Sequence, residues 1–114
     1  MANKNKKNFK LSIVEMFILM ILQSEDMYGY QLSSFIEEHT DGRLIISESS
    51  LYPTLYKLLK NGYISDREAV VENRRVRVYY HIEESGKTHL SELLSDYRDV
   101  VQGFQDIENA VNTK

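Results

Sequence analysis

The stretch SLYPTLYKLLKNGYISDREAVVENRRVRVYYHI (residues 50–82) predicts a helix followed closely by a β-hairpin. Its leucines recur at helical spacing between residues 51 and 59 and form one apolar face. Asn61-Gly62 suits the end of this helix, because glycine readily adopts the left-handed backbone found there. A serine within residues 47–50 is expected to cap its start. Proline is tolerated in a helix only in the first turn. Pro53 therefore favours a cap at Ser49 or Ser50, or a distorted first turn.

The end of this stretch has the pattern of a strand in a hairpin. Apolar residues alternate with arginine, tyrosine and histidine over residues 75–82, as in a half-buried strand. The partner strand is expected within residues 63–71, and the turn near residues 72–74. Three arginines lie at or beside this turn and make it basic.

Two further helices are expected upstream. The first runs from about Lys10 to Ser24 and is apolar nearly all round, so it must be covered on most sides, in part by a partner subunit. The second runs from about Met27 to His39, with Asp26 as its N-cap and Asp41-Gly42 as its stop. A short extended segment follows over residues 43–46.

A long last helix is expected from about Ser85 to Asn112. Its apolar residues alternate at spacings of three and four, which is a heptad seam. At a rise of about 1.5 Å per residue the helix is roughly 40 Å long, which exceeds what one small domain covers. We therefore interpret the seam as a dimer interface. Its members are Leu90, Leu93, Tyr97, Val100, Phe104, Ile107 and Val111.

This order of elements predicts a mostly α fold with a small β-hairpin, namely a winged helix-turn-helix with a long C-terminal dimerisation helix. The 114 residues are the size of one ordinary domain. We expect a flexible basic arm over residues 1–9, the winged helix-turn-helix domain over residues 10–82, and the dimerisation helix over residues 83–114.

Composition and hydrophobic pattern indicate the cellular compartment of the protein. The absence of cysteine excludes disulfides and thiolate metal sites and fits a reducing environment. The apolar run over residues 16–22 is far shorter than the roughly 20 residues that span a bilayer. Glu15 interrupts the longer apolar segment, and no signal-cleavage motif follows it. We expect a cytoplasmic protein that does not bind membranes.

The net charge of -3 does not indicate a nucleic-acid binder, but a phosphate backbone responds to local patches of positive charge. The outer face of the helix over residues 51–60 carries hydroxyls, tyrosines and lysines, and the hairpin arginines suit phosphates. The candidate DNA-binding residues are Ser49, Ser50, Tyr52, Pro53, Tyr56, Lys57, Lys60, Arg74, Arg75 and Arg77. The alternatives are a solvated helix face and an edge strand protected by charge. The N-terminal lysines are either a DNA-binding arm or a solubilising tail.

The sequence contains no pattern for catalysis. His39, His81 and His89 lack the spacing of metal ligands and have no cysteines to join them. A glycine-rich phosphate loop and a Ser-His-Asp arrangement are also missing. We expect no enzyme activity, no metal and no cofactor.

Six short blocks of the sequence carry a family resemblance. They are YGYQL (28–32), GRL (42–44), SLYPTLYKL (50–58), NGYI (61–64), RVRVYY (75–80) and ESG (84–86). In register over about residues 10–90, they resemble the PadR family of transcriptional regulators, in its compact form with a single C-terminal dimerisation helix. Ser49, Val78 and Ile82-Glu83 depart from the family pattern, and the last of these weakens the expected cap of the final helix.

The resemblance implies a homodimer whose C-terminal helices embrace the partner and which binds palindromic DNA operators with Tyr52 near the DNA. It also implies repression relieved by small planar or hydrophobic effectors. We place a candidate effector pocket at the dimer centre, where the first helix meets the last helices. Its expected walls are Met16, Phe17, Met20, Tyr97 and Phe104. The alternative role for each of these residues is to fill the dimer core.

The leading hypothesis is a sequence-specific, dimeric DNA-binding repressor. Two alternatives stay open. The first is a winged-helix protein-interaction module that does not bind DNA, which the negative net charge favours. The second is a dimer that binds small molecules and has lost its contact with DNA.

Overall fold

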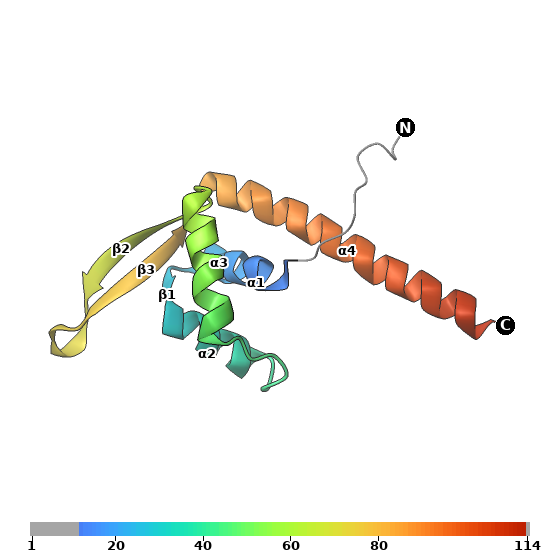
Figure 1. Cartoon of the computed structure of the whole chain (residues 1–114), viewed down its shortest axis with the longest axis horizontal. Coiled ribbons are helices and arrows are strands. Elements are labelled where there is room, and N and C mark those ends of the chain that lie inside the picture. Colours follow the sequence, from blue (N-terminus) through green and yellow to red (C-terminus); the bar gives the residue numbers. More distant parts are fainter. Residues whose placement is uncertain (1–11, 114) are drawn as a thin grey trace.

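The computed structural model describes residues 12–113, so the predicted basic arm over residues 1–9 lies outside the described part (Figure 1). The elements, in chain order, are α1 (Ile13–Ser24), β1 (Met27–Tyr28), α2 (Gly29–His39), α3 (Glu48–Lys60), β2 (Ile64–Val70), the 3-10 turn η2 (Glu72–Arg74), β3 (Val76–Ile82) and α4 (Glu84–Asn112). The predicted fold class, a mostly α winged helix-turn-helix with a small hairpin and a long C-terminal helix, is confirmed.

The sheet contains one strand more than the sequence predicted. Its order is β1-β3-β2, and β1 pairs antiparallel with residues 79–80 of β3. The prediction that a helix begins at Met27 with Asp26 as its cap is therefore wrong, because the edge of β3 binds this segment in an extended form. α2 begins at Gly29, and the side chain of Gln31 accepts a 3.1 Å hydrogen bond from the amide of Tyr28.

The start of α3 confirms a serine cap within residues 47–50, but not the late cap that Pro53 favours. The cap residue is Ser47, so Pro53 lies inside the helix and beyond its first turn. Proline has no amide hydrogen, so it donates no bond to the carbonyl of Ser49. One residue further on, the Thr54 hydroxyl donates to the carbonyl of Ser50 at 2.8 Å. The segment before α3, residues 43–46, forms a loop and not a strand.

The end of α3 confirms the predicted glycine stop. Gly62 has a φ of 77°. Its amide donates to the carbonyl of Leu59, and the amide of Tyr63 donates to the carbonyl of Leu58, both at 3.0 Å. This pair of bonds is the Schellman motif, which satisfies two carbonyls at the helix end and turns the chain towards β2.

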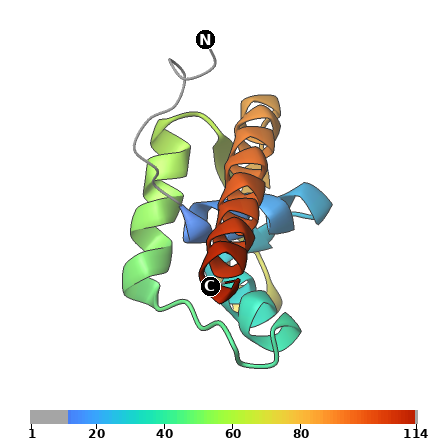
Figure 2. The same cartoon turned by 90° about the vertical axis from the view of Figure 1, so that its right-hand side faces the viewer.

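One apolar core joins the helices to the sheet. α1 lies at its centre and contacts α2, α3, α4 and β3 (Figure 2). The chain's own elements therefore cover most of the apolar surface of α1, which explains why this helix is apolar nearly all round. The largest fully buried side chains are Ile18, Leu19, Leu32, Leu51, Leu55, Leu58 and Leu90. Within residues 12–113 no helix is long and apolar enough to cross a membrane.

Glu15 on α1 is the one buried charged residue among residues 12–113. Its carboxylate lies 3.4 Å from the Lys57 ammonium on α3 and is hydrogen-bonded to the ring of His89 on α4. The His89 ring stacks on Tyr63, with ring centroids 4.1 Å apart. One buried carboxylate thus connects three helices.

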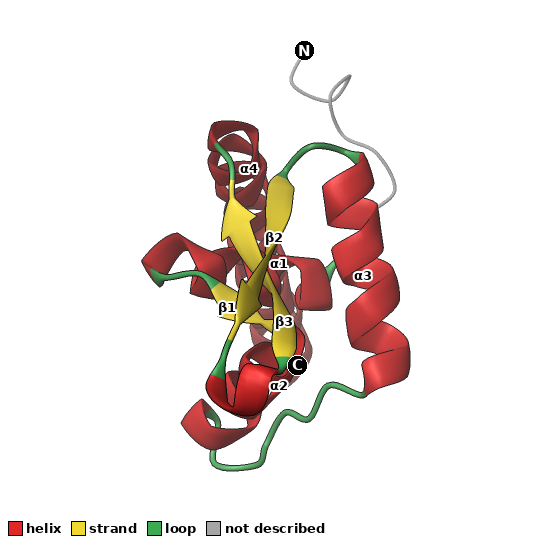
Figure 3. Cartoon of the chain, turned by 90° about the vertical axis from the view of Figure 1, so that its left-hand side faces the viewer, coloured by secondary structure: helices red, strands yellow, loops and turns green. Residues whose placement is uncertain are grey.

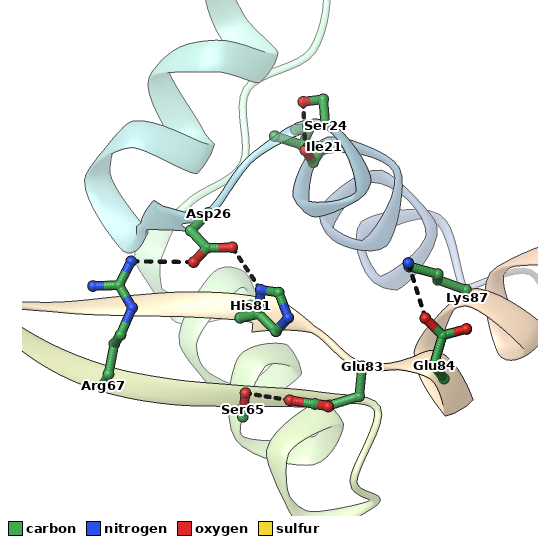
Figure 4. A network of polar contacts seen from close by, with 9 residues as sticks. All are labelled: Ile21, Ser24, Asp26, Ser65, Arg67, His81, Glu83, Glu84 and Lys87. Atoms are coloured by element: carbon green, nitrogen blue, oxygen red, sulfur yellow. Dashed lines mark hydrogen bonds and ion pairs between the residues drawn. The ribbon is translucent and has the colours of Figure 1, made fainter.

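α4 is anchored at its start and projects from the domain at its end. Its cap residue Glu83 makes no side-chain capping bond to the described backbone, as the weakened cap predicts, and instead accepts a hydrogen bond from Ser65 (Figure 4). Gly86 allows α4 to approach closely, because a Cβ there would overlap the carbonyl oxygen of Tyr63. Leu90 and Leu93 are buried in the core, and the rest of the helix extends the molecule to 63 Å along its longest axis (Figure 1).

Replacing His89 with leucine is expected to lower the free energy of unfolding by about 3 kcal/mol, because the buried Glu15 carboxylate loses a partner. Adding Glu15→Gln should recover much of this loss, since no buried charge then remains. Urea unfolding followed by circular dichroism measures both values. As a control, Lys87→Ala removes the exposed pair with Glu84 and should cost less than about 0.5 kcal/mol. Equal losses for H89L with and without E15Q would contradict the explanation.

Candidate nucleic-acid interface

The outer face of α3 is open to solvent beside the hairpin (Figure 3). Six of the residues predicted from the sequence form it. They are Ser49, Ser50, Tyr52, Pro53, Tyr56 and Lys60, all exposed. The first turns present small hydroxyls, which allow close approach to a groove, and Lys60 adds positive charge at the far end.

Tyr52 is held in place by a close contact with Gly29 at the start of α2. Its ring lies against Gly29 so closely that a Cβ on Gly29 would overlap the Tyr52 hydroxyl and ring. Gly29 therefore fixes the spacing between the start of α2 and α3, and Tyr52 keeps 45% of its surface exposed.

Tyr80 on β3 is a neighbour of Tyr52. Burial raises the pKa of the Tyr80 hydroxyl, and the neighbouring Tyr52 and Asp66 raise it further.

Lys57 differs from the other predicted residues of α3. Its ammonium lies 3.4 Å from the carboxylate of Glu15, although its side chain remains 59% exposed. The charge of Lys57 is therefore paired with a buried carboxylate, which the helical wheel of α3 alone does not reveal because Glu15 lies 42 positions away.

The hairpin turn exposes two of its three arginines. Arg74 and Arg75 are exposed at the tip. Asn73 and Arg74 both adopt the left-handed backbone, with φ of 58° and 59°, a conformation that asparagine tolerates better than most residues. Arg77 is half-buried, and its Cζ lies 4.9 Å from the centroid of the Tyr28 ring. The tip is therefore basic, whereas Arg77 is turned towards the domain.

A second group of side chains was not predicted as part of the site. Asp26 accepts one hydrogen bond from Arg67 on β2 at 3.1 Å and pairs with the ring of His81 on β3 at 2.8 Å (Figure 4). The bond from His81 and then that from Arg67 hold the pKa of the Asp26 carboxyl below its usual range. The three residues are far apart in the sequence, and no local spacing identifies them.

The effector pocket predicted at the dimer centre stays a prediction, and within one chain its expected walls do not line one cavity. Phe17 and Met20 line an apolar cavity together with Ile21 of α1, and its remaining walls come from α2 and the following loop. Met16 is 2% exposed and belongs to the core. Tyr97 and Phe104 lie on α4 and do not line this cavity. The full lining is Phe17, Met20, Ile21, Phe35, Ile36, His39, Thr40 and Leu44.

The heptad seam divides into two parts. Leu90 and Leu93 pack in the chain's own core, so they are not available to a partner. Beyond them Val100 is half-buried, and four residues are exposed over at least two-fifths of their surface. These four are Tyr97, Phe104, Ile107 and Val111.

The three histidines have structural partners. His39 stacks on Phe35, His81 pairs with Asp26, and His89 pairs with Glu15. Within the described part of the chain, no cluster of three or more histidine or carboxylate side chains forms a metal site.

The three-helix domain with a basic hairpin and a projecting helix defines a winged-helix regulator. Residues 18–92 match the Transcriptional regulator PadR-like family. That match spans more than half of the chain, and the chain belongs to this family. The family consists of transcriptional regulators, so the prediction that the chain is not an enzyme is confirmed.

Individual relatives agree with this assignment. A transcriptional regulator from Clostridium thermocellum superimposes with a TM-score of 0.77 at 30% identity, over 82% of this chain and 90% of that one. Bacillus subtilis PadR in complex with operator DNA superimposes with a TM-score of 0.68 at 26% identity, over 75% of this chain and 48% of that one. In sequence, the negative transcriptional regulator PadR of B. subtilis (strain 168) is 24% identical over 84% of this chain and 53% of its own length. The chain thus spans about half of that relative.

The lowered pKa of Asp26 predicts a pH-dependent contribution to stability. A carboxyl whose pKa falls on folding stabilises the protein above its unfolded pKa, about 3.9, and this contribution disappears as the pH falls through the folded value. Asp26→Asn should therefore lower the free energy of unfolding by up to about 1 kcal/mol at pH 7, and this effect should shrink as the pH falls below about 3.9. Thermal unfolding across this range measures the difference. Asp96→Asn on exposed α4 is the control, and a D26N effect that is independent of pH would contradict the assignment.

Proposed function

We propose that this PadR-family regulator is a cytoplasmic, sequence-specific DNA-binding repressor, which binds a palindromic operator as a homodimer and is released by a small hydrophobic effector. The observation that carries this proposal is the exposed outer face of α3 beside the basic tip of the hairpin (Figure 3). We call the hairpin of β2 and β3 the wing. A recognition helix with an adjacent wing is the arrangement that reads a major groove and contacts the neighbouring backbone.

The chemistry of the two surfaces supports a division of labour on DNA. Ser49, Ser50 and Tyr56 offer hydroxyl groups to base edges, and Tyr56 is 67% exposed. Arg74 and Arg75 at the hairpin tip suit bidentate contacts with phosphates. The relative from B. subtilis was solved with operator DNA, which supports the same use of the shared fold. In a dimer, two α3 helices would read half-sites about 34 Å apart, or a multiple of that spacing.

The exposed part of the seam supports the homodimer. Phe104, Ile107 and Val111 are each more than 60% exposed on one face of α4. Leaving three large apolar side chains in water at heptad spacing is unfavourable, and a second copy of the helix covers them. On α1, Met20 is 46% exposed and is available to the same partner.

The cavity between α1 and α2 supports an effector site. Its volume is about 150 Å³, which is the size of a cavity that holds a single aromatic ring. Phe17, Met20, Phe35 and Leu44 supply its apolar walls, and methionine adapts to ligands of varied shape. A ring bound there would touch both α1 and α2, and α2 carries Gly29 against Tyr52 of α3.

The wing is tested by Arg75→Ala, measured by fluorescence anisotropy on the DNA upstream of the protein's own coding region at several salt concentrations. Each phosphate contact contributes about 0.9 to the slope of log K against log salt, so losing one should weaken binding and reduce the slope by about that amount. Lys87→Ala, which removes an equal charge from the start of α4, should change neither quantity. Unchanged affinity and slope for R75A would remove the wing from DNA binding.

The seam is tested by Phe104→Asp, which places a charge on the apolar face of α4. Sedimentation should show a dimer for the unaltered protein and a monomer for the variant, together with at least tenfold weaker operator binding, because two half-sites are no longer linked. The neighbouring Gln105→Asp adds the same charge beside the seam and should remain dimeric. A dimeric F104D variant would exclude this face as the interface.

A further inference from the structure

Four side chains form a continuous stack across the outer face of the sheet. Arg77 lies over the Tyr28 ring at 4.9 Å, and the Tyr28 and Tyr79 rings meet edge to face at 5.3 Å. Arg67 lies over the Tyr79 ring at 5.2 Å. We call these four residues the stack. It crosses all three strands, because Tyr28 belongs to β1, Arg77 and Tyr79 to β3, and Arg67 to β2.

The stack is fixed at its inner end and reaches the wing at its outer end. Arg67 is hydrogen-bonded to Asp26 in the turn before β1, and Asp26 also holds His81 (Figure 4). At the other end, Arg77 is only one residue from the outermost pair of the ladder, Val76 opposite Val70. Beyond Arg77 the hairpin projects into solvent, and Val70 and Val76 are 70% and 58% exposed.

We propose that Arg77 is a positioning residue: by stacking on Tyr28 it fixes the angle of the wing relative to α2 and α3, and it does not itself bind a DNA phosphate. This inference rests on the proposed function. It assigns to Arg77 a role different from that of Arg74 and Arg75, which are exposed at the tip.

The surroundings of the guanidinium support this role. The Nε atom of Arg77 is buried and has no hydrogen-bond partner among the described residues, so this nitrogen is not presented to a phosphate. The flat guanidinium gains instead from the face of the tyrosine ring, and this attraction grows when water is excluded.

The position of Tyr28 explains why the angle of the wing would matter. Tyr28 directly precedes Gly29, and Gly29 is the close contact of Tyr52 on the outer face of α3. The path from the wing to α3 is therefore short: Arg77 to Tyr28, Tyr28 to Gly29, and Gly29 to Tyr52. A wing free to swing would present Arg74 and Arg75 to the backbone only part of the time, so the entropic cost of ordering it would weaken DNA binding.

The test compares Arg77→Met and Tyr28→Leu with Tyr28→Phe, which keeps the ring, in the same anisotropy titration. R77M and Y28L should each weaken binding roughly tenfold and leave the salt slope unchanged. The double variant should be no weaker than either single variant, because the two side chains act as one unit. Y28F should bind like the unaltered protein, and circular dichroism should show that all variants are folded.

Three results would overturn the inference. A salt slope reduced by about 0.9 in R77M, as expected for R75A, would make Arg77 a phosphate contact. Full affinity in Y28L would show that the stack is not needed. An equal loss in Y28F would point to a contact made by the Tyr28 hydroxyl.

A second measurement keeps the inference separate from the proposed function. Amide hydrogen exchange over residues 71–76 reports opening of the wing without DNA. Exchange should be faster in R77M and Y28L and unchanged in Y28F and R75A. If the unaltered protein bound no DNA, the proposed function would fail, while this exchange pattern would still decide whether the stack holds the wing; equal exchange in all variants would contradict it.

Discussion

The buried carboxylate of Glu15 is the constraint on which the arrangement of the helices depends. A charge in an apolar core is tolerated only with partners, and the partners here are Lys57 from α3 and His89 from α4. α3, which presents the outer face, and α4, which carries the seam, are both held to α1 by these contacts. Stacking of His89 on Tyr63 extends this connection to the start of the hairpin. α3 and α4 thus contact the same carboxylate on α1.

Close contacts at two glycines complete this arrangement. Gly86 lets α4 approach the turn after α3, and Gly29 lets Tyr52 approach α2. In each case a single Cβ would separate two elements. These contacts position α3 and the start of α4 from the side of the core. The outward side chains of α3, the wing and the projecting half of α4 remain exposed.

Local patterns in the sequence predicted most of the fold but only part of the site. The leucine spacing over residues 51–59, the Gly62 stop and the alternation over residues 75–82 were sufficient for α3 and the hairpin, because each depends on near neighbours in the chain. β1, the pairing of Lys57 with Glu15 and the stacking of Arg77 on Tyr28 depend on residues that are distant in sequence. No periodicity reports such contacts, so the sequence predicted a helical turn where β1 lies, and it did not predict the contact of Lys57 with Glu15 or that of Arg77 with Tyr28.

We propose that this PadR-family chain is a dimeric, sequence-specific DNA-binding regulator. The most direct measurement is a fluorescence-anisotropy titration of DNA from the region upstream of its own coding sequence against a scrambled duplex, at two salt concentrations. We expect tight binding to the upstream DNA alone, with two chains per duplex. Absence of binding to either duplex at low salt would contradict it and favour a winged-helix module that binds protein.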